Sequence, residues 1–214
     1  MSERGRIGNL VIVSGPSGAG KSALVSGVLR RVPQLGFSVS YTTRAPRGSE
    51  QNGVEYFFVN RSQFEELIHA DQLLEWAEVH GNYYGTSSGF VGGLLRSGKD
   101  VLLDIDVQGA KIIRRQQKDA IGIFVLPPSY AVLRDRIRKR SLDEGIVIEQ
   151  RLQRACEEIR HYPEYDYLIV NRDLDSSVHE LESIILGARC RMAARIECAK
   201  SVVSTFGGKD AEDP

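Results

Sequence analysis

The chain has 214 residues, with 28 lysines and arginines balanced by 28 aspartates and glutamates, so its formal net charge is zero. Hydrophobic residues make up 42% and charged residues 26%, fractions typical of a globular protein, which excludes disorder of the whole chain. The neutral charge argues against a general nucleic-acid or anionic-membrane binder. Uninterrupted apolar stretches such as residues 10–13 are far shorter than the ~18 residues of a transmembrane helix, so we expect a cytoplasmic protein of one domain.

Short apolar segments alternate along the chain with segments in which apolar residues recur at helical spacing. In chain order, we expect a strand at 10–13, a helix at 22–32, strands at 101–105 and 121–126, helices at 130–139 and 148–160, a strand at 167–170 and a helix at 176–199. This alternation favours an α/β fold with a sheet that is at least partly parallel.

One region interrupts the alternation. Residues 36–60 are rich in Ser, Thr, Tyr, Phe and Val and contain proline and glycine turn signals, which predicts a small β-rich insertion that extends to about residue 90. Within it, residues 64–76 are expected to be helical. Residues 89–93 hold three glycines, each costing about 0.8–1 kcal/mol in a helix interior, so a weak or frayed helix is expected there. The polar tail at residues 206–214 is predicted to be disordered.

The three cysteines include no CxxC pair. Cys190 and Cys198 lie on one expected helix, about 12 Å apart along its axis, whereas a disulfide allows at most about 7 Å between Cα atoms. We therefore expect free thiols in a reducing compartment and no zinc site.

Residues 15–22, GPSGAGKS, match the phosphate-loop pattern GxxxxGK[ST] between an expected strand and an expected helix. Glycines let backbone N–H groups turn inward around phosphate oxygens, and the start of the following helix adds partial positive charge. Lys21 would place its ammonium group on the β- and γ-phosphates, and Ser22 would offer a hydroxyl oxygen to Mg²⁺. The motif predicts nucleoside triphosphate binding and leaves the phosphoryl acceptor open. Its residues are Gly15, Pro16, Ser17, Gly18, Ala19, Gly20, Lys21 and Ser22.

Arg44 and Arg47 lie on either side of a proline turn in the expected insertion. Two guanidinium groups so placed can hold a phosphate through paired hydrogen bonds, and Tyr56 and Tyr84 can add phenolic donors. The alternative is a pair of solvated loop charges, which the neighbouring aromatic and hydroxyl residues disfavour.

Asp104 and Asp106 come at the end of an expected buried strand. Ligands of open α/β sheets gather at the carboxyl ends of strands, and carboxylates there can help to hold Mg²⁺. Capping of the strand end is the alternative. Further along, the basic run at residues 134–140 has three interpretations: a solvated helix face, a nucleic-acid patch, or a lid over phosphates. The neutral net charge counts against the second.

Four further blocks resemble the guanylate kinase family. They are SVSYTTRAPR at 38–47, GNYYGT at 81–86, LDIDVQG at 103–109 and YDYLIVN at 165–171, in the family's order after its phosphate loop. The resemblance covers about residues 8–205 and is strongest to the bacterial cytoplasmic type. It implies a P-loop kinase fold with a parallel-sheet core and helices on both faces. The single domain over 1–214 would comprise a core (about 8–36 and 91–205), a GMP-binding insertion (about 37–90) and a short helical lid (about 138–152).

The resemblance also implies roles for single residues. The positions that hold the GMP phosphate are Arg44, Arg47, Tyr56 and Tyr84, and those around the guanine base are Ser40, Glu75, Thr86 and Asp106. Arg140 and Arg151 match the lid arginines, and Asn171 is assigned to the ATP site. We assign Ser22 and Asp104 to the metal, and Lys21, Arg44, Arg140 and Arg151 to catalysis. Ser141 and Arg172 depart from the family's usual residues, and we have no account of Arg172.

The chemistry of guanine independently supports the base site. Its N1–H and 2-amino groups are donors, which suit acceptor-only carboxylates such as those of Glu75 and Asp106, and hydroxyls suit O6. Adenine has an unprotonated N1 that would face a carboxylate lone pair. A charge-assisted hydrogen bond contributes about 1.5–3 kcal/mol, or about 10- to 150-fold discrimination. Without the resemblance, Glu75 would be interpreted as a solvated helix charge.

The resemblance implies Mg²⁺-assisted in-line transfer of the γ-phosphoryl of ATP to GMP, giving ADP and GDP, in purine nucleotide metabolism. The second pKa of a phosphomonoester is near 6, so the attacking oxygen is largely deprotonated at pH 7 and needs no general base. The alternatives are a kinase for another nucleoside monophosphate, a non-catalytic interaction module of this family, and a GTPase. We expect ATP and GMP as partners, without nucleic acid or membrane; use of deoxy-GMP and oligomeric state stay open.

Overall fold

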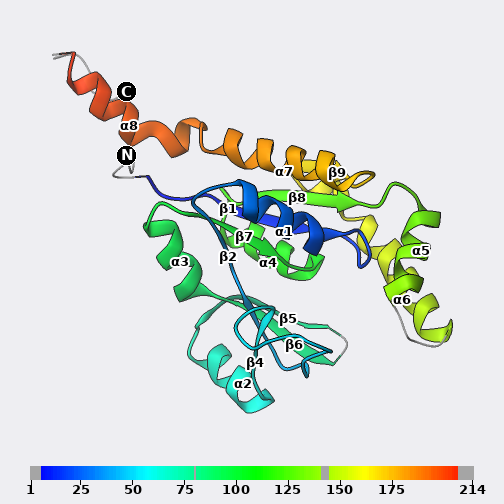
Figure 1. The fold of residues 1–214 in the computed structure, drawn as a ribbon. Coiled ribbons are helices and arrows are strands. Elements are labelled where there is room, and N and C mark those ends of the chain that lie inside the picture. Colours follow the sequence, from blue (N-terminus) through cyan, green and yellow to red (C-terminus); the bar gives the residue numbers. More distant parts are fainter. Residues whose placement is uncertain (1–5, 80, 141–144, 207–214) are drawn as a thin grey trace.

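The central sheet of the protein has five parallel strands in the order β2-β7-β1-β8-β9 (Figure 1). The structure is a computed structural model that describes residues 6–79, 81–140 and 145–206, with the backbone alone at residues 140 and 145–147. The strands are β1 (Leu10–Ser14), β2 (Leu35–Phe37), β7 (Asp100–Asp104), β8 (Ile121–Leu126) and β9 (Tyr167–Val170). Four of them confirm the predicted strands within one residue at each end, and the short edge strand β2 was not predicted.

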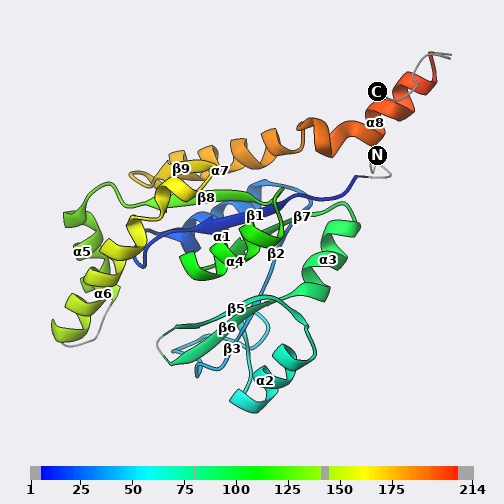
Figure 2. The same cartoon turned by 180° about the vertical axis from the view of Figure 1, so that it is seen from behind.

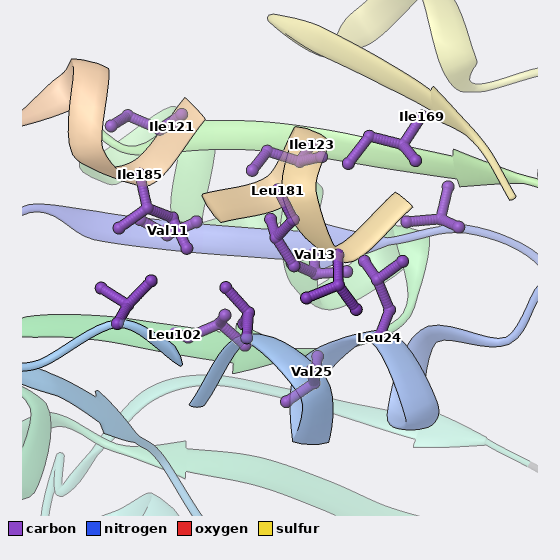
Figure 3. Close-up of a cluster of buried hydrophobic side chains, with 14 of the residues drawn as sticks. Val11, Val13, Leu24, Val25, Leu102, Ile121, Ile123, Ile169, Leu181 and Ile185 are labelled. Atoms are coloured by element: carbon purple, nitrogen blue, oxygen red, sulfur yellow. The ribbon is translucent and has the colours of Figure 1, made fainter. Parts of the chain in front are cut away.

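Helices cover both faces of this sheet, as predicted (Figure 2). On one face, α1 (Lys21–Arg31) and α7 (Leu174–Ala188) pack on the side chains of Val11 and Val13 (Figure 3). On the other, α3 (Ser88–Arg96) and α4 (Val107–Gln116) pack on Leu10 and Ile12. Successive side chains of a strand point to opposite faces, so the unbroken apolar run of β1 supplies both cores.

A second, smaller sheet forms the insertion, in the order β4-β3-β6-β5. Its elements are β3 (Ser40–Thr42), β4 (Tyr56–Phe58), α2 (Arg61–His69), β5 (Leu73–Val79) and β6 (Asn82–Ser87). Asn60 and Gln63 cap α2 reciprocally, and the helix buries Phe64 completely. The expectation of a β-rich insertion is thereby confirmed.

Two helices at the carboxyl-end side of the central sheet pack against each other and project from the body (Figure 1). They are α5 (Tyr130–Arg140) and α6 (Gly145–Ile159), followed by the short 3₁₀ helix η1 (Tyr162–Glu164). A small core of Leu133, Ile137, Leu152 and Ala155 joins them. Both helices agree with the predicted segments to within three residues at either end.

The predicted helix over residues 64–76 is wrong in its second half. Helix α2 ends at His69, and Asp71 takes the left-handed conformation with φ 52°. The chain then enters β5, where antiparallel pairing with β6 outweighs local helical spacing. Glu75 is consequently a strand residue, at an irregularity in the β5–β6 pairing between Leu73 and Glu75, and its side chain is buried.

The single helix predicted over residues 176–199 is also wrong, because the chain forms α7 and then α8 (Met192–Ser204). At the break, Arg189 donates hydrogen bonds to Asp100 Oδ2 (2.7 Å) and to the carbonyl of Pro33 (2.7 Å). Helix α3, predicted to be frayed, is continuous across its glycines, because Ser87 caps it and Val91 is buried beneath it. Ser141 and residues 207–214 of the tail lie outside the described part of the chain.

Candidate functional site

A cavity of about 330 Å³ lies between the two sheets, at the carboxyl ends of β1 and β7. The phosphate loop lines one part of it, and β5 and β6 of the second sheet line another. The predicted site residues among its walls are Gly15, Ser17, Gly18, Gly20, Lys21, Ser22, Ser40, Tyr56, Glu75, Tyr84, Asp104 and Asp106. Segments that are far apart in the sequence therefore meet around one cavity of the size that a small ligand needs.

The phosphate loop has the backbone conformation that its glycines were expected to permit. Gly15, Gly18 and Gly20 have φ values of 140°, 87° and 96°, which disfavour any residue with a side chain. A Cβ at Gly15 would lie 2.3 Å from the carbonyl oxygen of Val125. Because Gly20 is the N-cap of α1, the helix begins without a capping side chain, and its first N–H groups are left for a ligand.

Two side chains from elements distant in the sequence donate hydrogen bonds to the backbone of this loop. The buried amide of Asn171, directly after β9, donates a 2.8 Å hydrogen bond to the carbonyl oxygen of Ala19. Arg136 of α5 donates to the same carbonyl (3.1 Å) and to the carbonyl of Asn171 (3.1 Å). Asn171, which was predicted to bind ATP, therefore contacts the backbone of the loop and holds it in place.

Lys21 and Asp104 both line the cavity, and the positive charge of Lys21 acts on the Asp104 carboxyl. The ammonium group of Lys21 donates to the carbonyl oxygens of Gly15 (2.7 Å) and Pro16 (3.3 Å). The hydroxyl of Ser22 lies 3.4 Å from Asp104 Oδ2. Burial raises the pKa of the Asp104 carboxyl, although Lys21 and Ser22 act in the opposite direction. A hydroxyl and a carboxylate at this spacing are the hard oxygen donors that suit Mg²⁺.

Two carboxylates meet at the other wall. Glu75 is 5% exposed and accepts a 2.6 Å hydrogen bond from the hydroxyl of Thr86. Burial raises its pKa to about 7, and the nearby charge of Asp106 adds to the shift. Asp106 caps α4 by accepting a 2.9 Å hydrogen bond from the N–H of Gly109. Each carboxylate thus has one oxygen held by the protein, and both residues line the cavity, which makes this wall an acceptor-rich surface.

Arg44 is fixed by an acidic residue that the sequence analysis did not single out. Its guanidinium group donates to both carboxylate oxygens of Glu50, at 2.9 and 3.0 Å, and lies over the ring of Tyr56. Burial by itself would lower the pKa of Arg44, but Glu50 and then Tyr84 outweigh it and raise the pKa. Tyr56 and Tyr84 are in edge contact, with ring centroids 5.8 Å apart.

Arg47 and Arg151 are the other predicted arginines with described side chains, and neither they nor Arg44 are among the residues that line the cavity. The side chain of Arg47 is exposed, and its backbone N–H donates to Glu50. Arg151 lies on α6, and the side chain of Arg140, at the end of α5, is outside the described part of the structure.

Sequence reasoning missed three residues of this site. Glu50 anchors Arg44, Arg136 supports the loop, and Glu158 of α6 lines the cavity with one carboxylate oxygen 3.2 Å from the N–H of Ser17. The basic run at residues 134–140 contained the signal for Arg136. Nothing local marks Glu158, because its contact spans 141 positions of the chain.

Comparison with known proteins gives consistent matches over nearly the whole chain. The sequence profile of the family described as guanylate kinase matches residues 7–188. A guanylate kinase of Koribacter versatilis is 49% identical over 190 residues, which cover 87% of this chain and 82% of the relative. One of Bordetella pertussis is 50% identical over 200 residues, covering 94% and 93%. The crystal structure of guanylate kinase from Anaplasma phagocytophilum has a TM-score of 0.81 at 30% identity and covers 96% of this chain and 98% of that chain.

Proposed function

This chain belongs to the guanylate kinase family and is an ATP:GMP phosphotransferase, and we propose that the cavity between its two sheets is where the γ-phosphoryl of ATP passes to GMP. The observation that carries the proposal is the pairing of two unlike walls around one cavity. The phosphate loop with Lys21 suits a triphosphate, and the buried pair of Glu75 and Thr86 suits the donor edge of guanine.

The GMP site would combine residues of the insertion with Asp106, the N-cap of α4. Glu75 and Asp106 would accept from the N1–H and 2-amino groups of guanine, with Ser40 and Thr86 as hydroxyl partners. Arg44, which Glu50 and Tyr56 already orient, would bind the GMP phosphate together with Tyr56 and Tyr84. Arg47 is exposed and would reach the same phosphate by a change of rotamer.

On the ATP side, the N–H groups of residues 15–22 and the ammonium group of Lys21 would bind the phosphates. Ser22 and Asp104 fit a hard divalent cation by their donor chemistry and would hold Mg²⁺. When bound, that ion would neutralise charge on the phosphate oxygens. Arg140 and Arg151 would close over the donor phosphates, in a lid over about residues 138–152.

The reaction requires little of the protein beyond placement and charge. The attacking GMP oxygen is already largely ionised at pH 7, so the chain has to hold two anions in line and offset their repulsion. Closure of the insertion (about residues 37–90) and of the lid would exclude water, which would otherwise accept the phosphoryl group.

The helices of the described residues include none that is long and apolar enough to span a membrane.

The test is release of ADP from ATP and Mg²⁺, measured with GMP, deoxy-GMP, AMP, CMP or UMP and with no acceptor. We expect rapid ADP release with GMP and a rate near background without an acceptor. Use of AMP, CMP or UMP at a rate equal to that with GMP would refute guanine selection by Glu75 and Asp106, and equal rates without an acceptor would indicate a hydrolase.

A further inference from the structure

A carboxylate near the end of α6 lies directly against the phosphate loop. Glu158 is near the end of α6, and its Oε2 accepts a 3.2 Å hydrogen bond from the backbone N–H of Ser17, inside the loop. Glu158 and Ser17 line the same cavity as Lys21. The contact is not a local one, because 141 positions separate its partners, and it joins α6 to the core at the site assigned to the triphosphate.

The groups around the Glu158 carboxylate include a hydrogen-bond donor and a positive charge, as in a site that binds an anion. Burial raises the pKa of its carboxyl, while the N–H of Ser17 and the charge of Lys21 favour the ionised form; Asp106 opposes them. A backbone N–H and a lysine ammonium group are also the groups with which a phosphate loop binds phosphate oxygens. The carboxylate therefore occupies surroundings whose chemistry suits a phosphate.

We propose that Glu158 is an internal competitor of the ATP phosphates, a carboxylate that docks on the Ser17 amide and must leave it before the triphosphate can bind fully. The proposal rests on the proposed function, since it takes the loop as the ATP site. Two anions cannot share one N–H donor beside one lysine without repulsion, so ATP binding and the Glu158–Ser17 contact exclude each other. ATP would then release α6 from the loop.

Glu158→Gln removes the charge of this side chain and keeps its size, so it weakens the competitor without opening a void. Glu157→Gln is the matched control, because Glu157 is the neighbouring glutamate on α6 and its side chain is exposed. We expect E158Q to bind ATP about 3- to 10-fold more tightly than the wild type and E157Q to bind as the wild type does. Calorimetry with ATP in the presence of EDTA measures the Kd for ATP of each protein without any contribution from Mg²⁺.

The direction of the change separates competition from a structural role. Loss of a merely structural contact would loosen the loop, so ATP would bind more weakly; competition predicts a lower Kd and a lower KM for ATP, with the Kd for GMP unchanged. An E158Q Kd for ATP that equals or exceeds the wild-type value overturns the proposal. A wild-type enzyme that fails to bind ATP, or that releases ADP equally without GMP, would instead refute the proposed function.

Discussion

The hydroxyl of Thr86 donates a 2.6 Å hydrogen bond to Glu75, its partner across the β5–β6 pair. This bond and burial beneath the second sheet hold the carboxylate in one orientation toward the cavity. A Cβ at position 109 would lie 2.7 Å from Glu75 Oε2, so the glycine leaves room for the carboxylate in its present position beside α4. Contacts between β5, β6 and α4 therefore specify the wall that we propose faces guanine.

Replacing Glu75 should relax the choice of base. We expect Glu75→Ala to raise the KM for GMP and to lower the ratio of kcat/KM for GMP over AMP by about 10- to 150-fold, the value of one charge-assisted hydrogen bond. Steady-state kinetics with both nucleotides measure the ratio. Glu78→Ala is the control, because Glu78 is an exposed glutamate on the same strand. An unchanged ratio in the Glu75 variant would show that this carboxylate does not select guanine.

The pKa of Glu75, raised to about 7 by burial and by Asp106, predicts a pH dependence of GMP binding. The ionised carboxylate accepts from guanine, whereas the protonated form turns a proton toward guanine donors. GMP should thus bind more weakly as pH falls from 8 to 6, and binding near pH 7 should release a proton.

Calorimetry of GMP binding in buffers of different ionisation enthalpy would measure that proton. The phosphate of GMP also titrates, with a second pKa near 6, so Glu75→Gln supplies the reference in which only this contribution remains. Identical proton release by the wild type and E75Q would contradict a titrating Glu75.

Loss of the loop lysine should stop turnover and spare the acceptor site. Lys21 contacts the Gly15 and Pro16 carbonyls, and its positive charge acts on the Asp104 carboxyl. We expect Lys21→Ala to reduce kcat by at least about 1,000-fold, since a cation in a charge-stabilising position contributes several kcal/mol. The Kd for GMP, measured by calorimetry, should stay near the wild-type value. Lys118→Ala, at an exposed loop position, should be fully active; retained turnover in K21A would remove the proposed role of Lys21.

Asp100 should matter for stability and not for chemistry. This fully buried carboxylate, at the amino end of β7, accepts from Asn9 (2.8 and 3.0 Å) and Arg189 (2.7 Å) and pairs with Arg6. Asp100→Asn leaves two guanidinium groups without their anion and should cost about 3–5 kcal/mol, which lowers Tm by roughly 6–20 °C.

Thermal unfolding of D100N beside the exposed variant Asp119→Asn checks this expectation. The kcat of folded D100N should match that of the wild type, because the cavity lies at the other end of β7. A Tm within about 2 °C of the wild type would mean that the network adds little to stability.

The sequence by itself determined the phosphate loop and most of the central sheet. The residues of the loop are contiguous, and the glycines in that pattern predict the backbone conformation that Gly15, Gly18 and Gly20 adopt. The core strands are apolar on both faces, so their composition alone indicates burial. Family resemblance assigned Glu75 to the base site, and the structure places this residue in the cavity wall, whereas the helix predicted there from the sequence pattern is wrong.

Only the tertiary structure decided the contacts between distant segments. Glu75 lies on a strand because β6 pairs with it, and the chain turns at Arg189 because that side chain reaches Asp100. Asn171 and Glu158 both contact the phosphate loop, through hydrogen bonds that span more than a hundred residues of the chain. The local sequence indicates only local conformational preference. The interactions between distant segments depend on which surfaces the folded chain brings together. Their free energies outweigh a helix propensity of a few tenths of a kcal/mol per residue.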